Sequence, residues 1–379
     1  MRLTSFGGWL LVVGLAARGT GGIASADDKP PAGEQAWNQH RAAQYLDERA
    51  KTWFEFSGAG RGEAETKSAC ISCHTAGPYA LARPVLRKSN GATQPTVYEA
   101  RFIEQTKIRV EHWDELDSPK FRLLYDSDEQ KKKESWGTEA VMNAMILAFD
   151  DRNAGRERPS DSARRAFANL WRTQVSEGAH QGSWDWLNFQ LEPWEAEDAR
   201  YFGAAMAAIA VGTAPGYYTP GSDAEIRQKV TLLRGYLKDH LAGQNLFNRA
   251  WLLWAARALD GLLTLDEQTV VIADLLKTQQ ADGGWRLAAL GVFSRGDGTP
   301  QDETSDGYAT GLVLHVLQTA GVSKNDRGIA NGLSWLRENQ SPTGEWRGSS
   351  VNKQRDLATH VGRFMSDAAT AYAVLALSH

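Results

Sequence analysis

The chain of 379 residues has only two cysteines, Cys70 and Cys73, and both lie in one short segment. Without distant cysteine pairs, the chain is not a disulfide-stabilised scaffold of the kind found among small secreted proteins. The chain also lacks a strong excess of either charge, because 42 basic and 46 acidic residues leave a formal net charge of only −4. This balance gives no electrostatic reason to expect nucleic acid as a partner. No apolar run approaches the ~20 residues that span a bilayer, so we expect no membrane-spanning helix after the N-terminal segment.

The first 26 residues have the layout of a secretory signal peptide. Arg2 is the only early charge, residues 9–17 form a short apolar run, and Ala24-Ser25-Ala26 is a cleavage site of the A-x-A type. We therefore predict that residues 1–26 direct export to the periplasm or elsewhere outside the cytoplasm; an uncleaved anchor is the alternative. Residues 27–35 are polar and rich in proline, which predicts a linker, and residues 36–379 are expected to form a single domain.

Signals for β-strands are scarce, and alanine, leucine, glutamate and arginine favour helix. Two kinds of helical segment alternate: amphipathic ones, and ones that are apolar almost all round and therefore expected to be buried. The amphipathic, outer segments are 37–56, 96–112, 162–173, 224–241, 266–279 and 326–339. The apolar, inner segments are 138–149, 199–211, 250–259, 308–320 and 368–377, with a weaker one at 79–87 that contains Pro84. About six outer/inner hairpins predict an all-α fold, an α/α toroid around a central cavity.

Three loops that leave outer segments share a pattern of glutamine, glycine and tryptophan. The sequences are Gln340 to Gly344 and Trp346, Gln280 to Gly283 and Trp285, and a longer version from Gln174 to Gly182 and Trp184. The pattern resembles the QW repeat of squalene–hopene cyclases. The resemblance implies the toroid fold of the terpenoid cyclase and prenyltransferase superfamily, and hydrophobic ligands such as isoprenoids. Each tryptophan is expected to pin one hairpin to the next.

The chemistry of these families is missing from the sequence. The D-x-D-D motif with which squalene cyclases protonate an alkene is absent, and the nearest stretch, 302–306, has the wrong spacing. Asp306 and Asp367 are instead expected to cap the inner helices that follow them. Prenyltransferases hold zinc with Asp, Cys and His, but both cysteines here lie far from the corresponding loops.

The segment Cys70-Ile71-Ser72-Cys73-His74 is a C-x-x-C-H motif. In an exported chain this motif predicts one covalently attached c-type haem in a loop at 66–78: the two thiols add to the haem vinyl groups, and His74 becomes an axial iron ligand. A dithiol or disulfide, a zinc site and a chance occurrence remain as alternatives.

The sixth position of the iron is less clearly indicated. Met142 and Met145 lie in an apolar helix and are expected to pack in the core. Closure of a toroid brings the last hairpin beside the first, which nominates His360 and Met365, both expected in the last loop between an outer and an inner segment, as sixth ligands. His112 at the end of the second outer segment and His180 in the longer tryptophan loop are further candidates, and a five-coordinate iron is the alternative.

An acidic and aromatic stretch at 184–198 includes Glu192, Trp194 and Glu195. Paired carboxylates beside tryptophan can serve glycoside hydrolysis, although acids near a helix start are the simpler interpretation.

The leading functional prediction is a periplasmic haem protein of squalene cyclase-like fold that performs electron transfer or haem redox chemistry near an apolar cavity. A redox partner protein or a hydrophobic small molecule is expected as its partner. The alternatives are a non-redox toroid enzyme, either terpenoid cyclase-like or glycan-active, and a noncatalytic binding or scaffold protein. A central cavity filled by side chains would favour the last of these.

Overall fold

The computed structural model describes residues 37–379, so the predicted signal peptide at 1–26 and linker at 27–35 lie outside the described residues. Within 37–379, no helix is both long and apolar enough to cross a membrane.

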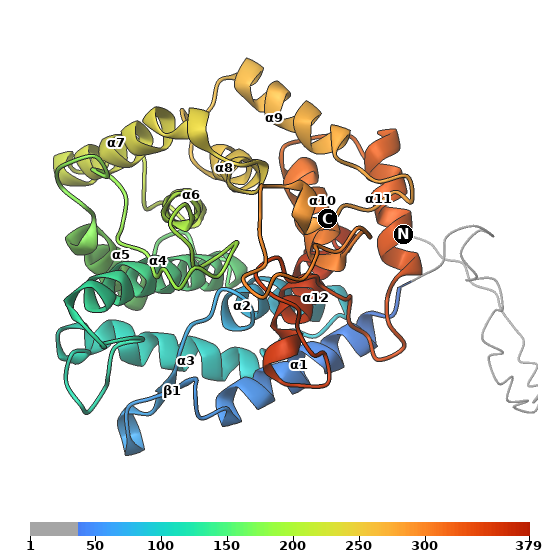
Figure 1. Ribbon diagram of the computed structural model, residues 1–379. Coiled ribbons are helices and arrows are strands. Elements are labelled where there is room, and N and C mark those ends of the chain that lie inside the picture. Colours follow the sequence, from blue (N-terminus) through green and yellow to red (C-terminus); the bar gives the residue numbers. More distant parts are fainter. Residues whose placement is uncertain (1–36) are drawn as a thin grey trace, which may run out of the picture. The chain divides into compact units, whose positions relative to one another are not determined.

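The described chain consists of outer and inner helices in strict alternation (Figure 1). The outer helices are α1 (Gln39–Glu55), α3 (Val97–Glu111), α5 (Asp161–Thr173), α7 (Ala224–Asp239), α9 (Leu265–Lys277) and α11 (Arg327–Glu338). The inner helices are α2 (Ala76–Ser89), α4 (Glu129–Asn153), α6 (Ala199–Thr213), α8 (Leu246–Ala258), α10 (Gly307–Thr319) and α12 (Phe364–Leu377). A short antiparallel pair, β1 (Gly60–Arg61) and β2 (Ser68–Ala69), precedes the C-x-x-C-H segment.

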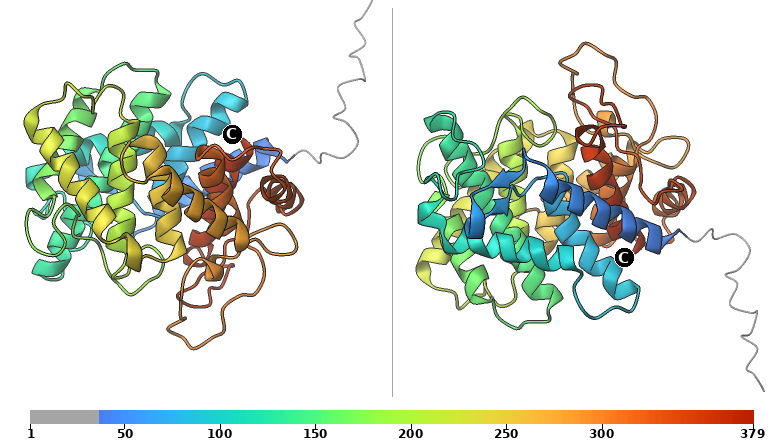
Figure 2. Two further views of the ribbon diagram at one scale, coloured as in Figure 1. Left: turned by 90° about the horizontal axis from the view of Figure 1, so that it is seen from above. Right: turned by 90° about the horizontal axis from the view of Figure 1, so that it is seen from below.

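The six inner helices form a closed ring. Each packs against the next in chain order, from α2 through α4, α6, α8 and α10 to α12, and α12 packs back against α2. The first outer helix, α1, also contacts α12, and the blue and dark red segments lie side by side in Figures 1 and 2. The predicted all-α toroid of six hairpins is therefore confirmed.

One inner helix begins earlier than the sequence pattern predicts. The segment 138–149 was expected as a helix, but α4 begins at Glu129, where the side chain of Asp128 accepts a hydrogen bond from the backbone N–H of Lys131. The polar run 130–134 therefore lies in the first turns of α4. Glu134 in this run is buried, where Lys131 and the amide of Gln130 contact its carboxylate. These two partners explain how the carboxylate of Glu134 is buried, while Gln130 and Lys133 of the same run stay exposed.

The centre of the toroid is filled by side chains. A cavity of about 10 Å³ remains, large enough for about one water molecule. Its walls come from inner helices and include Leu81, Met145, Phe202, Trp251 and Tyr372. The expectation of an apolar central cavity that receives a ligand is therefore wrong, because large aromatic and methionine side chains occupy the space. By the criterion given above, this filled centre favours a noncatalytic binding or scaffold protein over a ligand held inside the ring.

The three tryptophan loops end their outer helices in the same way. Each indole N–H donates to a carbonyl in the last turns of the preceding outer helix, at 2.7–2.8 Å, which satisfies one of the free carbonyls at a helix end. All three tryptophans are fully buried. The pairs are Trp184 with Leu170, Trp285 with Leu275, and Trp346 with Leu336.

The glutamine of each loop bridges its own turn to the next outer helix. The amides of Gln174, Gln279 and Gln340 each donate to two carbonyls, one in the loop and one at the neighbouring helix. The sequence pattern selected Gln280, which lies one residue away from the bridging position. Gln340 reaches the carbonyl of Asn38 at 3.0 Å, so the last loop joins the first helix and closes the ring.

Candidate functional site

The C-x-x-C-H segment is fixed between β2 and α2 by hydrogen bonds. The backbone N–H of Cys70 donates to Ala59 at 2.7 Å, and the carbonyl of Cys70 accepts from the indole of Trp53 at 2.9 Å. The hydroxyl of Ser72 accepts from the backbone N–H groups of Thr75 and Ala76, so it caps the first turn of α2. Ser72, between the two cysteines, therefore stabilises the start of α2, and His74 lies two residues before the first residue of that helix.

Both cysteines are reduced and shielded. Cys70 is buried and Cys73 is half-buried, and neither forms a disulfide. Burial raises the pKa of the Cys70 thiol to about 11 and also raises the pKa of Cys73. Catalytic dithiols need a lowered thiol pKa, because the thiolate is the nucleophile. The dithiol alternative is therefore disfavoured by the surroundings of the two sulfurs.

The tautomer of His74 follows from its hydrogen bonds. The hydroxyl of Thr75 donates to the Asp367 carboxylate at 2.7 Å, and the same oxygen lies 2.8 Å from Nδ1 of His74. Because the hydroxyl hydrogen is used toward Asp367, the Thr75 oxygen accepts, and Nδ1 of His74 carries the proton. The lone pair of His74 therefore resides on Nε2, for which no hydrogen-bond partner exists among the described residues. Burial lowers the pKa of His74 to about 3, which keeps the ring neutral.

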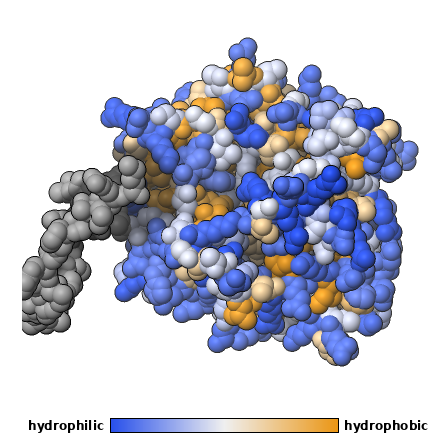
Figure 3. Space-filling view, turned by 180° about the vertical axis from the view of Figure 1, so that it is seen from behind, coloured by the Kyte–Doolittle hydropathy of each residue, from blue (hydrophilic) through white to orange (hydrophobic). Residues whose placement is uncertain are grey.

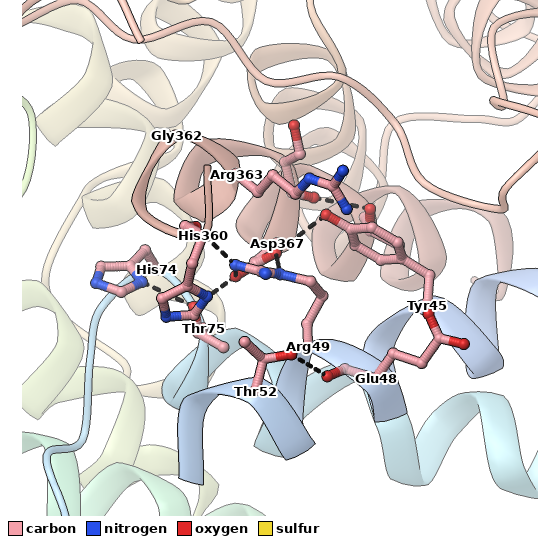
Figure 4. Close-up of polar contacts among 12 residues, drawn as sticks. Tyr45, Glu48, Arg49, Thr52, His74, Thr75, His360, Gly362, Arg363 and Asp367 are labelled. Atoms are coloured by element: carbon pink, nitrogen blue, oxygen red, sulfur yellow. Dashed lines mark hydrogen bonds and ion pairs between the residues drawn. The ribbon is translucent and has the colours of Figure 1, made fainter. Parts of the chain in front are cut away.

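A buried ion pair holds this arrangement in place (Figure 4). The guanidinium of Arg49 on α1 binds both oxygens of Asp367 on α12, with Nε–Oδ1 at 2.5 Å and Nη2–Oδ2 at 3.0 Å. The hydroxyl of Tyr45 donates to the same carboxylate at 3.1 Å. Asp367, expected to cap an inner helix, instead joins the first and last hairpins. Asp306 does cap its helix, because its carboxylate accepts from backbone N–H groups at the start of α10.

Of the four candidate sixth ligands, His360 lies beside the C-x-x-C-H segment. Trp53 contacts the rings of both His74 and His360, with centroid separations of 5.1 and 6.2 Å. Phe364 also contacts both, stacking on His74 at 3.8 Å and meeting His360 edge-on at 5.0 Å. Burial lowers the pKa of His360 to about 4, so this ring is also neutral.

The other candidates have different surroundings. Met365 was expected in a loop, but it lies in the first turn of α12 and is buried in the core. His112 at the end of α3 pairs with Glu115 at 2.8 Å and stacks on Phe121. His180 is exposed and lies near His240. No contact brings these three to His74.

The sequence predicted metal binding at the C-x-x-C-H segment, as haem iron or, alternatively, as zinc; for a metal ion held by clustered side chains this prediction is wrong within residues 37–379. No group of three or more His, Cys, Asp or Glu side chains in this part of the chain could hold a metal ion. The zinc alternative for the cysteine segment is thereby removed, because a structural zinc needs four protein ligands and a catalytic one three. A haem iron differs in this respect, since the porphyrin supplies four nitrogens and the protein adds one or two ligands.

The acidic stretch faces the same region. Burial raises the pKa of Glu195 to about 7, against the effect of Lys131 and Arg355. Burial and the nearby Asp198 raise the pKa of Glu192 to about 7. The intervening Trp194 lies 6.3 Å from the ring of His74, so this loop lies beside the C-x-x-C-H segment.

The sequence interpretation did not include Arg49, Tyr45 or Thr75. The sequence of α1 did contain an indication of Arg49. Buried residues recur at helical spacing on one face of this helix, and Arg49 lies on that face with Ala42, Leu46 and Trp53. A charged residue within a buried stripe requires a partner, although its identity is not readable from spacing.

Comparisons with known proteins assign no family. No family model matches the chain, and no curated protein matches it. Similar solved structures include three glycosidase variants, one of them in complex with glucose. They are 13–14% identical, with TM-scores of 0.48–0.49, and the matches cover 90% of this chain and 97% of theirs. Likeness at this level does not transfer an activity.

Proposed function

We propose that the protein carries one c-type haem, attached through Cys70 and Cys73, with His74 as an axial ligand. The observation that carries this proposal is the state of His74, whose Nδ1 is protonated and oriented by Thr75 and whose Nε2 is free. A histidine that ligates a metal usually donates its other ring N–H to an oxygen, and this partner fixes the ring. In the proposed site Asp367 orients Thr75, and Thr75 orients His74.

The residues present fit the protein side of such a site. The two thiols are reduced and protonated, which suits addition of each S–H across one vinyl C=C bond: a C–S bond forms, the hydrogen goes to the other carbon, and no oxidant is consumed. When bound, a haem supplies a one-electron Fe(III)/Fe(II) couple. Cys73 lines the void of about 10 Å³ at the toroid centre, which has room for about one water. The proposal therefore places the group on the rim with the loops, and attachment requires the Cys73 thiol to turn toward that rim.

The proposal also includes export of the protein and a common origin with toroids that carry QW-type loops. Haem attachment of this kind takes place outside the cytoplasm, in agreement with the signal peptide predicted at residues 1–26. The QW-type loops support a common origin with squalene cyclase toroids, while the filled centre argues against a terpenoid substrate held within the ring.

The test is to produce the full chain with a cytochrome c maturation system and to record its pyridine haemochrome spectrum after acid–acetone extraction. We expect a c-type band that survives extraction, and one haem per chain by mass. A Cys70→Ala/Cys73→Ala variant is the matched control and is expected to lose covalent haem. A wild-type protein that is colourless, or whose haem is extracted by acid–acetone, overturns the proposal.

A glycan-active enzyme is the second candidate, favoured by the raised pKa values of Glu192 and Glu195. A carboxyl group with a pKa near 7 can donate a proton to a leaving oxygen at neutral pH. This candidate predicts release of reducing sugar from oligosaccharides and its loss in Glu195→Gln. Absence of hydrolysis over a panel of α- and β-linked oligosaccharides would eliminate it.

A further inference from the structure

A cavity of about 590 Å³ opens between α2, α3 and the C-terminal end of α4. This volume lies within the range of about 300–1,000 Å³ that is usual for small-molecule sites. Its lining residues lie between 79 and 107 and at 150–154, apart from the C-x-x-C-H segment and from the acidic stretch at 184–198. On the face seen in Figure 3, apolar residues are interspersed with hydrophilic ones, so a recess shields an apolar ligand from water better than that face does.

One wall of the cavity is apolar. The rings of Tyr79 and Phe102 are buried and pack against each other, with their centroids 5.1 Å apart. Pro84 and Ile103 are half-buried and line the same cavity. Ligand sites usually combine such a wall with a few polar groups that fix the orientation of the ligand. The charges at the edge of the cavity therefore indicate which ligand would fit.

Two of the basic side chains at the cavity already have partners within the protein. The guanidinium of Arg87 pairs with Glu99 at 3.0 Å and donates to the carbonyl of Thr93 at 2.8 Å. The ammonium of Lys88 donates to the backbone carbonyl of Asn153 at 2.8 Å. Because both groups are engaged in this way, they leave little positive charge to attract an anionic ligand.

Asp150, near the end of α4, is a carboxylate without a partner. It is half-buried, and its side chain makes no hydrogen bond or ion pair with any residue of 37–379. The adjacent Asp151 is buried but paired, because it accepts from the backbone N–H of Ser160 at 2.7 Å and contacts Arg156 at 3.0 Å. Burial raises the pKa of Asp150, and the nearby Lys107 opposes this rise only in part. A negative charge at the C-terminal end of a helix is also unfavourable, whereas a cation there is stabilised.

We propose that this cavity binds a small organic amine with an apolar or aromatic body. The protonated amine donates to the carboxylate of Asp150, and the body lies against Tyr79 and Phe102. A hydrogen bond between two charged groups is stronger than a neutral one, so the carboxylate selects an amine over an alcohol of the same shape. Glu104, which is exposed and lines the same cavity, adds negative charge and disfavours an anionic ligand. The proposal is independent of haem attachment, because it uses none of the residues of the C-x-x-C-H segment.

The experiment is isothermal titration of the full chain with tryptamine, with tryptophol as its neutral counterpart and indole-3-acetate as its anionic one. We expect tryptamine to bind about tenfold more tightly than tryptophol, and indole-3-acetate to bind most weakly. Asp150→Asn should weaken tryptamine binding about tenfold and leave tryptophol binding within about twofold. Asp239→Asn is the matched control, because Asp239 also lies at the C-terminal end of a helix, α7, but is exposed; it should change neither affinity.

A second variant tests the location of the site. Ala100 is exposed and lines the cavity, so Ala100→Phe fills space there without disturbing the core and should abolish binding of both tryptamine and tryptophol. Absence of tryptamine binding to the wild type, a preference for indole-3-acetate, or a tryptamine affinity that either Asp150→Asn or Ala100→Phe leaves unchanged overturns the proposal. Circular dichroism of each variant verifies that the helices remain, so that a lost affinity reports on the cavity.

Discussion

Substitution of Asp367 by asparagine should destabilise the protein strongly, because it leaves Arg49 buried without a counter-charge. The side chains of Arg49 and Asp367 are 7% and 2% exposed, and they join α1 to α12 at the seam of the ring. Removing one member of a buried ion pair typically costs 3–5 kcal/mol. Since domains unfold with a free energy of about 5–15 kcal/mol, Asp367→Asn should remove a large share of the stability.

Removal of the other partner of the ion pair, Arg49, should lower the free energy of unfolding by less. Arg49→Met leaves a buried carboxylate, but the hydroxyls of Tyr45 and Thr75 still donate to it, so we expect about 3 kcal/mol, at the lower end of the same range. The double variant Arg49→Met/Asp367→Asn should cost less than the sum of the two single variants, by about 2 kcal/mol. Neighbours that share one ion pair are coupled in this way, and a double-mutant cycle measures the coupling.

The assay is equilibrium unfolding in urea, followed by far-ultraviolet circular dichroism. Urea is uncharged and does not screen the ion pair as a guanidinium salt would. Glu111→Gln is the matched control, because its pair with Arg165 also joins two helices, here the outer helices α3 and α5, but is exposed, at 61% and 58%. The control should change the free energy of unfolding by less than about 1 kcal/mol. If Asp367→Asn costs no more than the control, the reasoning about ring closure is refuted.

Three further predictions concern the loops. Trp346→Phe removes the N–H that satisfies the carbonyl of Leu336 and leaves a gap, so it should cost about 2–4 kcal/mol in urea unfolding; a loss below 1 kcal/mol would contradict the capping role. Gly344→Ala should cost about 1–3 kcal/mol, because φ is +103° and a Cβ would lie 2.3 Å from a carbonyl oxygen of α1; an unchanged unfolding midpoint would count against the close approach. The pKa of Glu192 is raised from 4.5 to about 7 in the folded protein, so ionisation of this carboxyl lowers the free energy of unfolding as the pH rises from about 4.5 to 7. Glu192→Gln removes this loss, and the variant should therefore be more stable than the wild type by about 1 kcal/mol more at pH 8 than at pH 5. Exposed Glu197→Gln is its control, and equal pH profiles for the two variants would show the prediction to be wrong.

Local pattern was sufficient for the architecture. The alternation of one-sided and wholly apolar segments predicted six hairpins, because a helix that is apolar all round must be buried. Glycine and tryptophan at recurring positions located the loops that connect neighbouring hairpins. These features depend on periods of 3.6 residues and on turn chemistry, which a sequence displays directly.

Other features depended on pairs of residues that are distant in the chain. Gln279 rather than Gln280 bridges its loop to the next helix, because only the three-dimensional register decides which amide faces Gly328. The centre of the ring was predicted to be open, but side-chain volumes from several helices fill it, and such a sum is not visible in any one segment.

By itself, the sequence determined the helical rhythm, the all-α toroid and the short segment on which the proposed haem chemistry depends. Tertiary structure alone decided which of four loop candidates lies beside His74, and that Asp367 orients it through Thr75. Residues 74 and 360 come together because Arg49 on the first helix and Asp367 on the last form a buried pair when the ring closes. A desolvated charge must meet its partner in space, and separation along the chain gives no indication of where that partner lies.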